Sequence, residues 1–280
     1  MLVKNLLASL ALASTAVEAT KILVPLYSWS EDCWPELQSA AAANPSASFI
    51  AIINPNSGPV SDLSDPSLYC VPVLRQKIPN LTLVGYVRTT YGARAPEDVV
   101  ADINEYAAWS LLSVSAGGVK GTPKLDGIFF DETPTFLDDT SAFGTYTGYA
   151  AVARSKFGSK NSTVIYNPGA KVNPRLYRSA DYIVGFEDAY SAWSTSKFPS
   201  AANQAKTIMM VHTFPSASRT LQSFVRRLIP AYGGLYVTNT DIREEDVYNV
   251  FGSDWKDFVK YMATYSKQAS AKARRMLKLE

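Results

Sequence analysis

The chain has 280 residues and a mass of 30.6 kDa, and 47% of its residues are hydrophobic, which suffices to bury the core of one barrel-sized domain or two smaller ones. The net charge is +2, but residues 253–280 hold seven Lys or Arg and three acids, which leaves 20 basic and 22 acidic side chains in residues 1–252. This slightly acidic body argues against a nucleic-acid-binding surface.

The chain begins with the pattern of a secretory signal peptide over Met1–Ala19. The segment carries a basic Lys4, an apolar run from Leu6 to Val17, and small residues at the usual cleavage positions. A short amino-terminal membrane anchor is the alternative. No later stretch reaches about 18 uninterrupted apolar residues, so we expect no stable membrane insertion. The expected location is secreted, with cell-wall association as a further option.

Export would make two kinds of covalent modification accessible. Asn80 and Asn161 each open an Asn-x-Thr sequon just before a strand-like run, so both are candidates for glycosylation in a eukaryotic host. Cys33 and Cys70 are the only cysteines, and we expect both to lie in loops after neighbouring strands. An oxidising compartment favours a disulfide between them, and two separate buried thiols are the alternative.

The single histidine, His212, limits the chemistry that the chain can perform. With one histidine and no paired cysteine spacing, we expect no zinc site or other metal site, and no cofactor. No Gly-x-Ser-x-Gly motif accompanies His212, so a serine hydrolase is not indicated. His212 is therefore interpreted either as a partner of a sugar hydroxyl or as a buried, hydrogen-bonded residue.

Short runs rich in β-branched and aromatic residues recur along the chain and alternate with helical patterns. The clearest helix is predicted over Pro96 to Leu112, where proline suits the first turn and Val99, Ile103, Tyr106 and Ala107 form one apolar face. The predicted strands are Ile22 to Tyr27, Ser48 to Ile53, Leu81 to Val87, Leu125 to Asp131, Thr163 to Asn167, Asp181 to Glu187, Lys206 to His212, and Gly234 to Thr238.

Eight strand and helix units in about 230 residues predict a single (β/α)8 barrel, the TIM-barrel fold. A doubly wound open sheet is the alternative, but no Gly-rich phosphate loop follows the first strand. We place the barrel domain at residues 20–252. Residues 253–280 are predicted to form a basic helix that packs on the barrel or extends from it. Contact of this helix with a wall polymer or a membrane is a second interpretation.

Aromatic, amide and charged side chains gather where the predicted strands end. The carboxyl ends of barrel strands form the usual active-site face, and sugars offer C–H faces for stacking and hydroxyls for hydrogen bonds. We therefore expect a polysaccharide-binding cleft, although a single aromatic residue at such a position often packs only at the rim. The candidate substrate-binding residues are Tyr27, Trp29, Asn54, Tyr86, Arg88, Asn167, His212 and Tyr236.

Three carboxylates at two strand ends are the candidate catalytic residues. Because side chains alternate along a strand, Asp131 should point into the barrel mouth while Glu132 begins the loop. Glu187 ends a strand two positions away around the barrel, within reach of the roughly 5–9.5 Å separation that glycoside hydrolysis uses. The alternative for each acid is a helix cap or a surface carboxylate.

Short motifs in a fixed order resemble the spherulin-type family of fungal secreted proteins, glycoside hydrolase family 135. The similarity runs from about Ile22 to Phe251. The motifs are Val24-Pro25-Leu26-Tyr27, Ile53-Asn54-Pro55-Asn56-Ser57-Gly58-Pro59, Gly85-Tyr86-Val87 with Tyr91-Gly92, Asp126 to Glu132, Asn167-Pro168-Gly169, and Phe186-Glu187.

The resemblance implies a (β/α)8 barrel and endo-acting cleavage of α-1,4-linked N-acetylgalactosamine in galactosaminogalactan, a polymer of fungal walls and biofilms. It also implies that Asp131, Glu132 and Glu187 carry the catalysis. Some relatives have an amino-terminal membrane anchor, where this chain has a cleavable-looking signal. The family name began with a spore-associated protein, so the resemblance alone does not fix the substrate.

The sequence thus predicts a secreted, monomeric glycoside hydrolase. Asp131 is expected to be the nucleophile or to stabilise an oxocarbenium-like transition state, Glu187 to be the general acid and base, and Glu132 to position the sugar or to tune its neighbour. Assistance by the substrate's N-acetyl group is an alternative route. Two rival functions keep the same fold: a non-catalytic glycan-binding wall or spore-coat protein, and a barrel glycosidase that acts on another polysaccharide.

Overall fold

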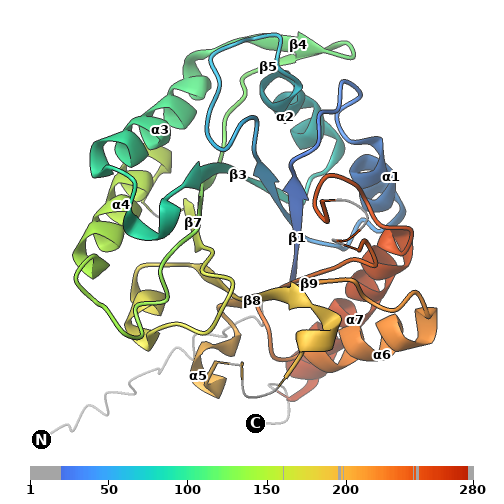
Figure 1. Ribbon diagram of the computed structural model, residues 1–280. Coiled ribbons are helices and arrows are strands. Elements are labelled where there is room, and N and C mark those ends of the chain that lie inside the picture. The colour runs from blue at the N-terminus through green and yellow to red at the C-terminus, as the bar shows by residue number, and fades with distance from the viewer. Residues whose placement is uncertain are drawn as a thin grey trace, which may run out of the picture.

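The computed structural model describes residues 20–276 except 160, 195, 196, 198, 242, 244 and 245, so the predicted signal peptide lies outside the described residues. Eight parallel strands close into a barrel in the order β1-β10-β9-β8-β7-β6-β3-β2, with helices around the outside (Figure 1). Within the described part of the chain, no helix is long and apolar enough to cross a membrane.

The barrel strands fall where the sequence predicted them, within one or two residues at most ends. Closure is made by β1 and β10, where Lys21 pairs with Gly234 and Ile22 with Leu235, and this pairing excludes the doubly wound open sheet. The strands are β1 (Lys21–Leu26), β2 (Phe49–Ile53), β3 (Leu81–Arg88), β6 (Gly127–Asp131), β7 (Thr163–Tyr166), β8 (Tyr182–Ala189), β9 (Thr207–His212) and β10 (Gly234–Val237).

Prolines open the first three helices, because the missing N–H is not needed in the first turn. The predicted helix from Pro96 is confirmed, but its α-helical part ends at Ala108, and a 3-10 turn, η2 (Trp109–Leu111), follows. The helices are α1 (Pro35–Ala43), α2 (Pro66–Lys77), α3 (Pro96–Ala108), α4 (Phe143–Phe157), α5 (Ala201–Gln204), α6 (Ser218–Leu228) and α7 (Trp255–Met276), and further 3-10 turns are η1 (Thr90–Gly92), η3 (Pro174–Arg178) and η4 (Tyr190–Ala192).

Two local features were not predicted. An antiparallel hairpin of β4 (Val114–Ala116) and β5 (Val119–Gly121) turns at two glycines and lies beside α2 (Figure 1). In β8, the register with β9 shifts between Val184 and Phe186, on either side of Gly185. A bulge of this kind changes which of the following side chains face the barrel interior, and Glu187 follows it directly.

A disulfide joins the loop after β1 to α2. Cys33 and Cys70 are bonded, with their Cα atoms 5.2 Å apart, as the sequence predicted. The expected location of Cys70 was wrong, because this residue lies inside α2 rather than in a loop.

The carboxyl-terminal helix α7 lies beside α1 and α6 on the outside of the barrel (Figure 1). Its inner face buries Phe258, Val259 and Met262, and the indole of Trp255 donates to the backbone oxygen of Glu36. Its lysines at 256, 260, 267 and 272 are exposed.

Candidate active site

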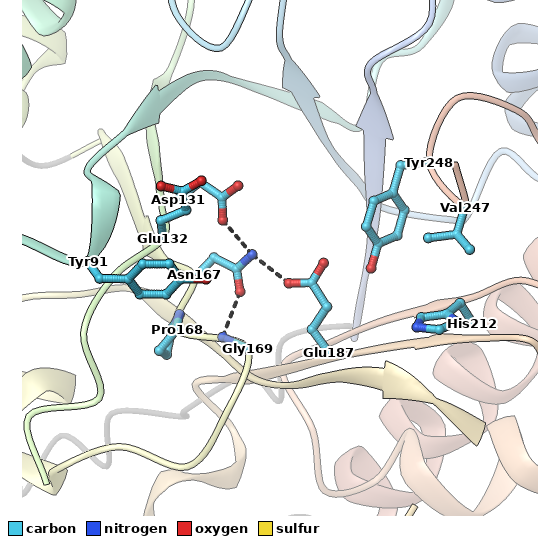
Figure 2. A pocket seen from close by; sticks show the side chains of 10 residues that line it. All are labelled: Tyr91, Asp131, Glu132, Asn167, Pro168, Gly169, Glu187, His212, Val247 and Tyr248. Carbon is cyan, nitrogen blue, oxygen red and sulfur yellow. Dashed lines mark hydrogen bonds between the residues drawn. The ribbon is translucent and has the colours of Figure 1, made fainter. Parts of the chain in front are cut away.

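Two carboxylates and an amide meet at the carboxyl ends of three consecutive strands. Asp131 ends β6, Asn167 follows β7, and Glu187 lies near the end of β8. The Asn167 Nδ2 atom donates to Asp131 Oδ1 and to Glu187 Oε2, each at 2.7 Å (Figure 2). Those two oxygens are therefore no farther apart than twice that distance. The two acids are brought together as the sequence predicted, and the amide between them was not foreseen in this role.

The orientation of the Asn167 amide is fixed from the other side. Its oxygen accepts the backbone N–H of Gly169 at 3.0 Å, so the NH2 group must face the carboxylates. Gly169 has φ of +63°, a left-handed conformation that residues with a side chain rarely adopt, and a Cβ there would be in van der Waals contact with Glu187. The Asn167-Pro168-Gly169 turn thus supplies a donor group that is built for two acids.

Asp131 is also held by β3. The Tyr86 hydroxyl donates to Asp131 Oδ2 at 2.6 Å, so both oxygens of this carboxylate accept hydrogen bonds. Burial and the nearby Asp131 raise the pKa of Tyr86, which keeps it a protonated donor at ordinary pH. Burial also raises the pKa of Asp131, although the hydrogen bonds from Tyr86, the Glu132 backbone and Asn167 oppose that rise.

Glu187 is also driven toward the protonated form. Burial raises its pKa first, and the negative charge of Asp131 raises it further. Two residues, Tyr248 and Asn167, oppose this rise in the pKa of Glu187. Three groups oppose the corresponding rise at Asp131. Two close carboxylates titrate as a pair, and in this pair we assign the shared proton to Glu187.

Tyr248 is a cavity-lining residue that sequence reasoning missed. It lies in the loop after β10, its hydroxyl acts to lower the pKa of Glu187, and its ring packs against the rings of Tyr27 and Tyr236, with both centroid distances at 5.9 Å. No strand or helix periodicity covers this loop, so only its position beyond the last strand could have drawn attention to it.

Glu132 occupies a strained position beside the pair. Its φ is +52°, in the left-handed region that residues other than glycine seldom adopt. Its carboxylate accepts a hydrogen bond from Arg88 Nε at 3.1 Å, and the Arg88 side chain is half exposed. This arrangement turns Glu132 away from the regular strand direction.

These groups surround a cavity of about 470 Å³ at the mouth of the barrel. Figure 2 shows the Tyr91 ring beside Glu132 and Asn167, with His212 on the Tyr248 side of Glu187. Among the described residues, no cluster of His, Cys, Asp or Glu is arranged to hold a metal ion. The cavity is lined by Tyr91, Asp131, Glu132, Asn167, Pro168, Gly169, Glu187, His212, Val247 and Tyr248.

The predicted site residues divide into three groups. Asp131, Glu132, Asn167, Glu187 and His212 line the cavity. Burial lowers the pKa of His212, which is thus a neutral ring, and its Nδ1 lies 2.9 Å from the Thr213 hydroxyl.

The second group consists of tyrosines that pack behind the residues of the cavity wall. Tyr27 packs edge-on against Tyr86, with ring centroids 5.6 Å apart, while Tyr236 is buried against Tyr248. None of these three predicted residues, Tyr27, Tyr86 or Tyr236, is among the residues that line the cavity.

The third group does not line this cavity. Arg88 reaches it only through Glu132, and the Asn54 side chain closes a turn by accepting the Ser57 N–H at 2.8 Å. Trp29 is 67% exposed and borders a separate cavity of about 430 Å³ on the other side of the loop that carries Tyr248. Their predicted place in a common cleft with the carboxylates is therefore not observed.

The sequon asparagines lie far from these strand ends. Asn80 directly precedes β3 and Asn161 lies just before β7, so both are at the end of the barrel where strands begin. Both side chains are exposed, and the Asn80 amide donates to the Pro45 backbone oxygen at 2.9 Å.

The fold and the carboxylate pair define a glycosidase-like (β/α)8 barrel protein. The chain belongs to the spherulation-specific family 4, Spherulin4, which matches residues 21–262. This confirms the spherulin-type resemblance that the sequence motifs indicated.

Particular relatives agree with this assignment. Spherulin-4 of Physarum polycephalum is 34% identical over 241 residues, which are 81% of this chain and 66% of that protein; the chain thus spans just under two thirds of its relative. The crystal structure of Aspergillus clavatus Sph3 in complex with GalNAc superposes with a TM-score of 0.76 at 28% identity, covering 88% of this chain and 98% of Sph3.

A more distant structure shares the fold alone. The PgaB (BpsB) glycoside hydrolase domain of Bordetella bronchiseptica matches with a TM-score of 0.51 at 10% identity, over 79% of this chain and 94% of that domain.

Proposed function

We propose that this protein is a secreted glycoside hydrolase that cleaves α-1,4-linked N-acetylgalactosamine within galactosaminogalactan. The observation that carries the proposal is the Asp131–Asn167–Glu187 arrangement, two carboxylates bridged by one amide at the mouth of the barrel. The GalNAc bound to Sph3, a structural relative that is matched over 98% of its chain, supports the choice of sugar.

The proposed roles follow from the local electrostatics. Glu187 holds the proton and delivers it to the oxygen of the departing sugar, because burial and the charge of Asp131 favour its neutral form. Hydrogen bonds from Tyr86 and Asn167 keep Asp131 anionic. Asp131 faces the positive charge that develops at the anomeric carbon, as a nucleophile or as a stabilising charge. Glu132 contacts the sugar from the adjacent wall.

The spacing of the pair favours retention of configuration. Retaining enzymes place their carboxyl groups about 5–5.5 Å apart, and inverting enzymes place them about 6.5–9.5 Å apart to admit a water molecule. The shared donor at 2.7 Å from each oxygen keeps the two bonded oxygens no more than twice that distance apart, which is shorter than the separation in inverting enzymes.

The test is release of reducing ends from purified galactosaminogalactan by the wild type and by Asp131→Asn, Glu132→Gln and Glu187→Gln. We expect losses of at least about 100-fold for Asp131 and Glu187, because each acts on charge in the transition state. Asp188→Asn is the matched control, since Asp188 follows Glu187 in β8 but pairs with Lys197 outside the cavity. Full activity in folded Asp131 and Glu187 variants contradicts the assignment.

The two rival functions give different outcomes in the same assay. A non-catalytic wall or spore-coat protein would bind the polymer without releasing reducing ends. A glycosidase for another polysaccharide would release them only from that polymer, so several fungal and bacterial exopolysaccharides belong in the same assay.

A further inference from the structure

A buried threonine joins the two loops that carry Tyr91 and Glu132. Thr89 follows β3 and is 1% exposed. Its hydroxyl lies 2.7 Å from the backbone oxygen of Asp131 and 2.9 Å from that of Glu132, and its N–H donates to the Asp131 oxygen at 3.1 Å. The loop after β3 is thereby fastened to the loop after β6.

The direction of the hydroxyl is set by α4. The Tyr146 hydroxyl donates to Thr89 Oγ1 at 2.7 Å. A threonine hydroxyl has one proton, so with Tyr146 as its donor, Thr89 directs that proton to the two backbone oxygens. Tyr146 is itself held, because its backbone oxygen accepts the Tyr166 hydroxyl at 2.6 Å.

The backbone that this bond holds is unusual. Thr90, Tyr91 and Glu132 have φ of +51°, +51° and +52°, and none of them is a glycine. Such conformations persist only where the surroundings fix them. The Glu132 backbone oxygen accepts the Thr89 hydroxyl and also the Tyr91 N–H at 2.7 Å, so one carbonyl locks both strained turns.

We propose that Thr89 and Tyr146 are positioning residues, a hydroxyl pair that fixes Glu132 and Tyr91 as one wall of the sugar-binding cavity. Neither hydroxyl belongs to the cavity lining, so both act through the backbone they hold. The inference rests on the proposed function where it assigns Glu132 and Tyr91 to the sugar. It adds residues that no motif at the strand ends indicated.

A second tyrosine and threonine pair provides a matched control. The Tyr177 hydroxyl lies 2.8 Å from Thr207 Oγ1, which also lies 2.9 Å from the Asn203 backbone oxygen, and Thr207 is fully buried. This pair sits at the start of β9, at the opposite end of the barrel from the cavity. Thr89→Val and Thr207→Val therefore remove comparable buried hydroxyls without a large change in side-chain volume.

The experiment compares kcat, KM and the melting temperature of Thr89→Val, Tyr146→Phe and Thr207→Val with the wild type on the polymer that the wild type cleaves. We expect kcat of Thr89→Val to fall about 10- to 100-fold with KM within about threefold, because small displacements of catalytic groups cost this much. Tyr146→Phe should show a smaller fall, Thr89→Ser should restore activity, and Thr207→Val should keep kcat within about twofold despite a similar fall in melting temperature.

Equal kcat values for Thr89→Val and Thr207→Val overturn the inference, and so does a loss that Thr89→Ser fails to restore. If Thr89→Val does not fold, Tyr146→Phe decides by the same comparison. A crystal structure of either variant gives a readout that needs no turnover: Glu132 should leave the left-handed region, and its unchanged position contradicts the proposal. An inactive wild type would instead count against the proposed function.

Discussion

Asn167 is the residue on which the geometry of the pair depends. It donates one N–H to each carboxylate, and its oxygen accepts a hydrogen bond from the Gly169 N–H, so a flipped amide would lose all three contacts. Only a side-chain amide can donate two hydrogen bonds and accept a third from one planar group of this size. An asparagine that follows a strand between two strands ending in acids can therefore bridge the two carboxylates, and its role goes beyond that of a polar residue at the start of a loop.

Replacing Asn167 tests this role. We expect Asn167→Leu to lower kcat about 100-fold, since both carboxylates lose a donor and can shift relative to the sugar. Asn54→Leu is the control, because Asn54 also follows a strand but lies outside the cavity. Steady-state kinetics and thermal melting of both variants check the expectation. Similar activity of the two would show that the bridge is dispensable.

At the scale of elements, the residue directly before α7, Asp254, has a carboxylate with an unsatisfied oxygen. Asp254 Oδ1 accepts the Asn239 N–H at 3.2 Å, but Asp254 Oδ2 and Asn239 Oδ1 are buried and have no hydrogen-bond partner among the described residues. Burial is the main reason that the pKa of Asp254 rises to about 6. The start of this helix therefore favours a neutral group.

The raised pKa predicts how stability changes with pH. The folded protein holds the Asp254 proton up to pH of about 6, whereas the unfolded chain loses it near pH 4. Stability is therefore lost as pH rises from about 4 through about 6. Asp254→Asn keeps the accepting oxygen and adds a donor, so we expect a higher melting temperature than the wild type at pH 7.5 and no gain below pH of about 4. Calorimetry at the two pH values measures both, and destabilisation at pH 7.5 contradicts the account.

The disulfide acts at the same scale by tying one loop to a neighbouring helix. It closes a segment of 37 residues between the loop after β1 and α2. Loop-closure entropy for a segment of that length corresponds to about 3–4 kcal/mol. The loop that bears Trp29 is thus restrained independently of any sugar.

At the scale of the whole molecule, the glycan candidates and the cavity occupy opposite ends of the barrel. Asn80 and Asn161 precede strands, and the carboxylates follow strands, in a sheet whose barrel strands are all parallel. Glycans at these asparagines would leave the cavity open. We expect Asn80→Gln with Asn161→Gln to lower the mass of protein from a eukaryotic secretory host while kcat/KM stays within about twofold. Mass spectrometry and the reducing-end assay measure this, and a large loss in kcat/KM would place a glycan near the substrate.

The barrel could be predicted because its physical signals are local. Each strand is a short apolar run at regular spacing, and the acids at 131 and 187 end two such runs. Closure of the sheet required the pairing of β1 with β10, which no local pattern encodes. The register shift at Gly185 was missed for the same reason, since it depends on pairing with β9. The hairpin of β4 and β5 is local, but each of its strands has only three residues, too few to show a strand pattern.

The candidate site was predictable in its carboxylates and less so in their surroundings. Tyr248 belongs to an irregular loop, and the left-handed backbone of Glu132 depends on Thr89, which lies 43 residues earlier in the chain. Trp29 and Asn54 carry the right chemistry at strand ends, but their loops turn them away from the cavity. Composition at a strand end thus indicates candidates, and the loop conformation selects among them.

The placement of the chemistry on β6, β7 and β8 has a consequence for how this family can diverge. The bridged carboxylates are held by three adjacent strands, with Tyr86 of β3 as a neighbour. The loops after β1 and β2, which carry Trp29 and Asn54, contribute no hydrogen bond to that group in the described structure. Insertions or substitutions in those two loops beyond Tyr27 can therefore change the surface around the barrel mouth while the bridged carboxylates keep their geometry, so the outer loops and the carboxylate group can vary separately on one barrel.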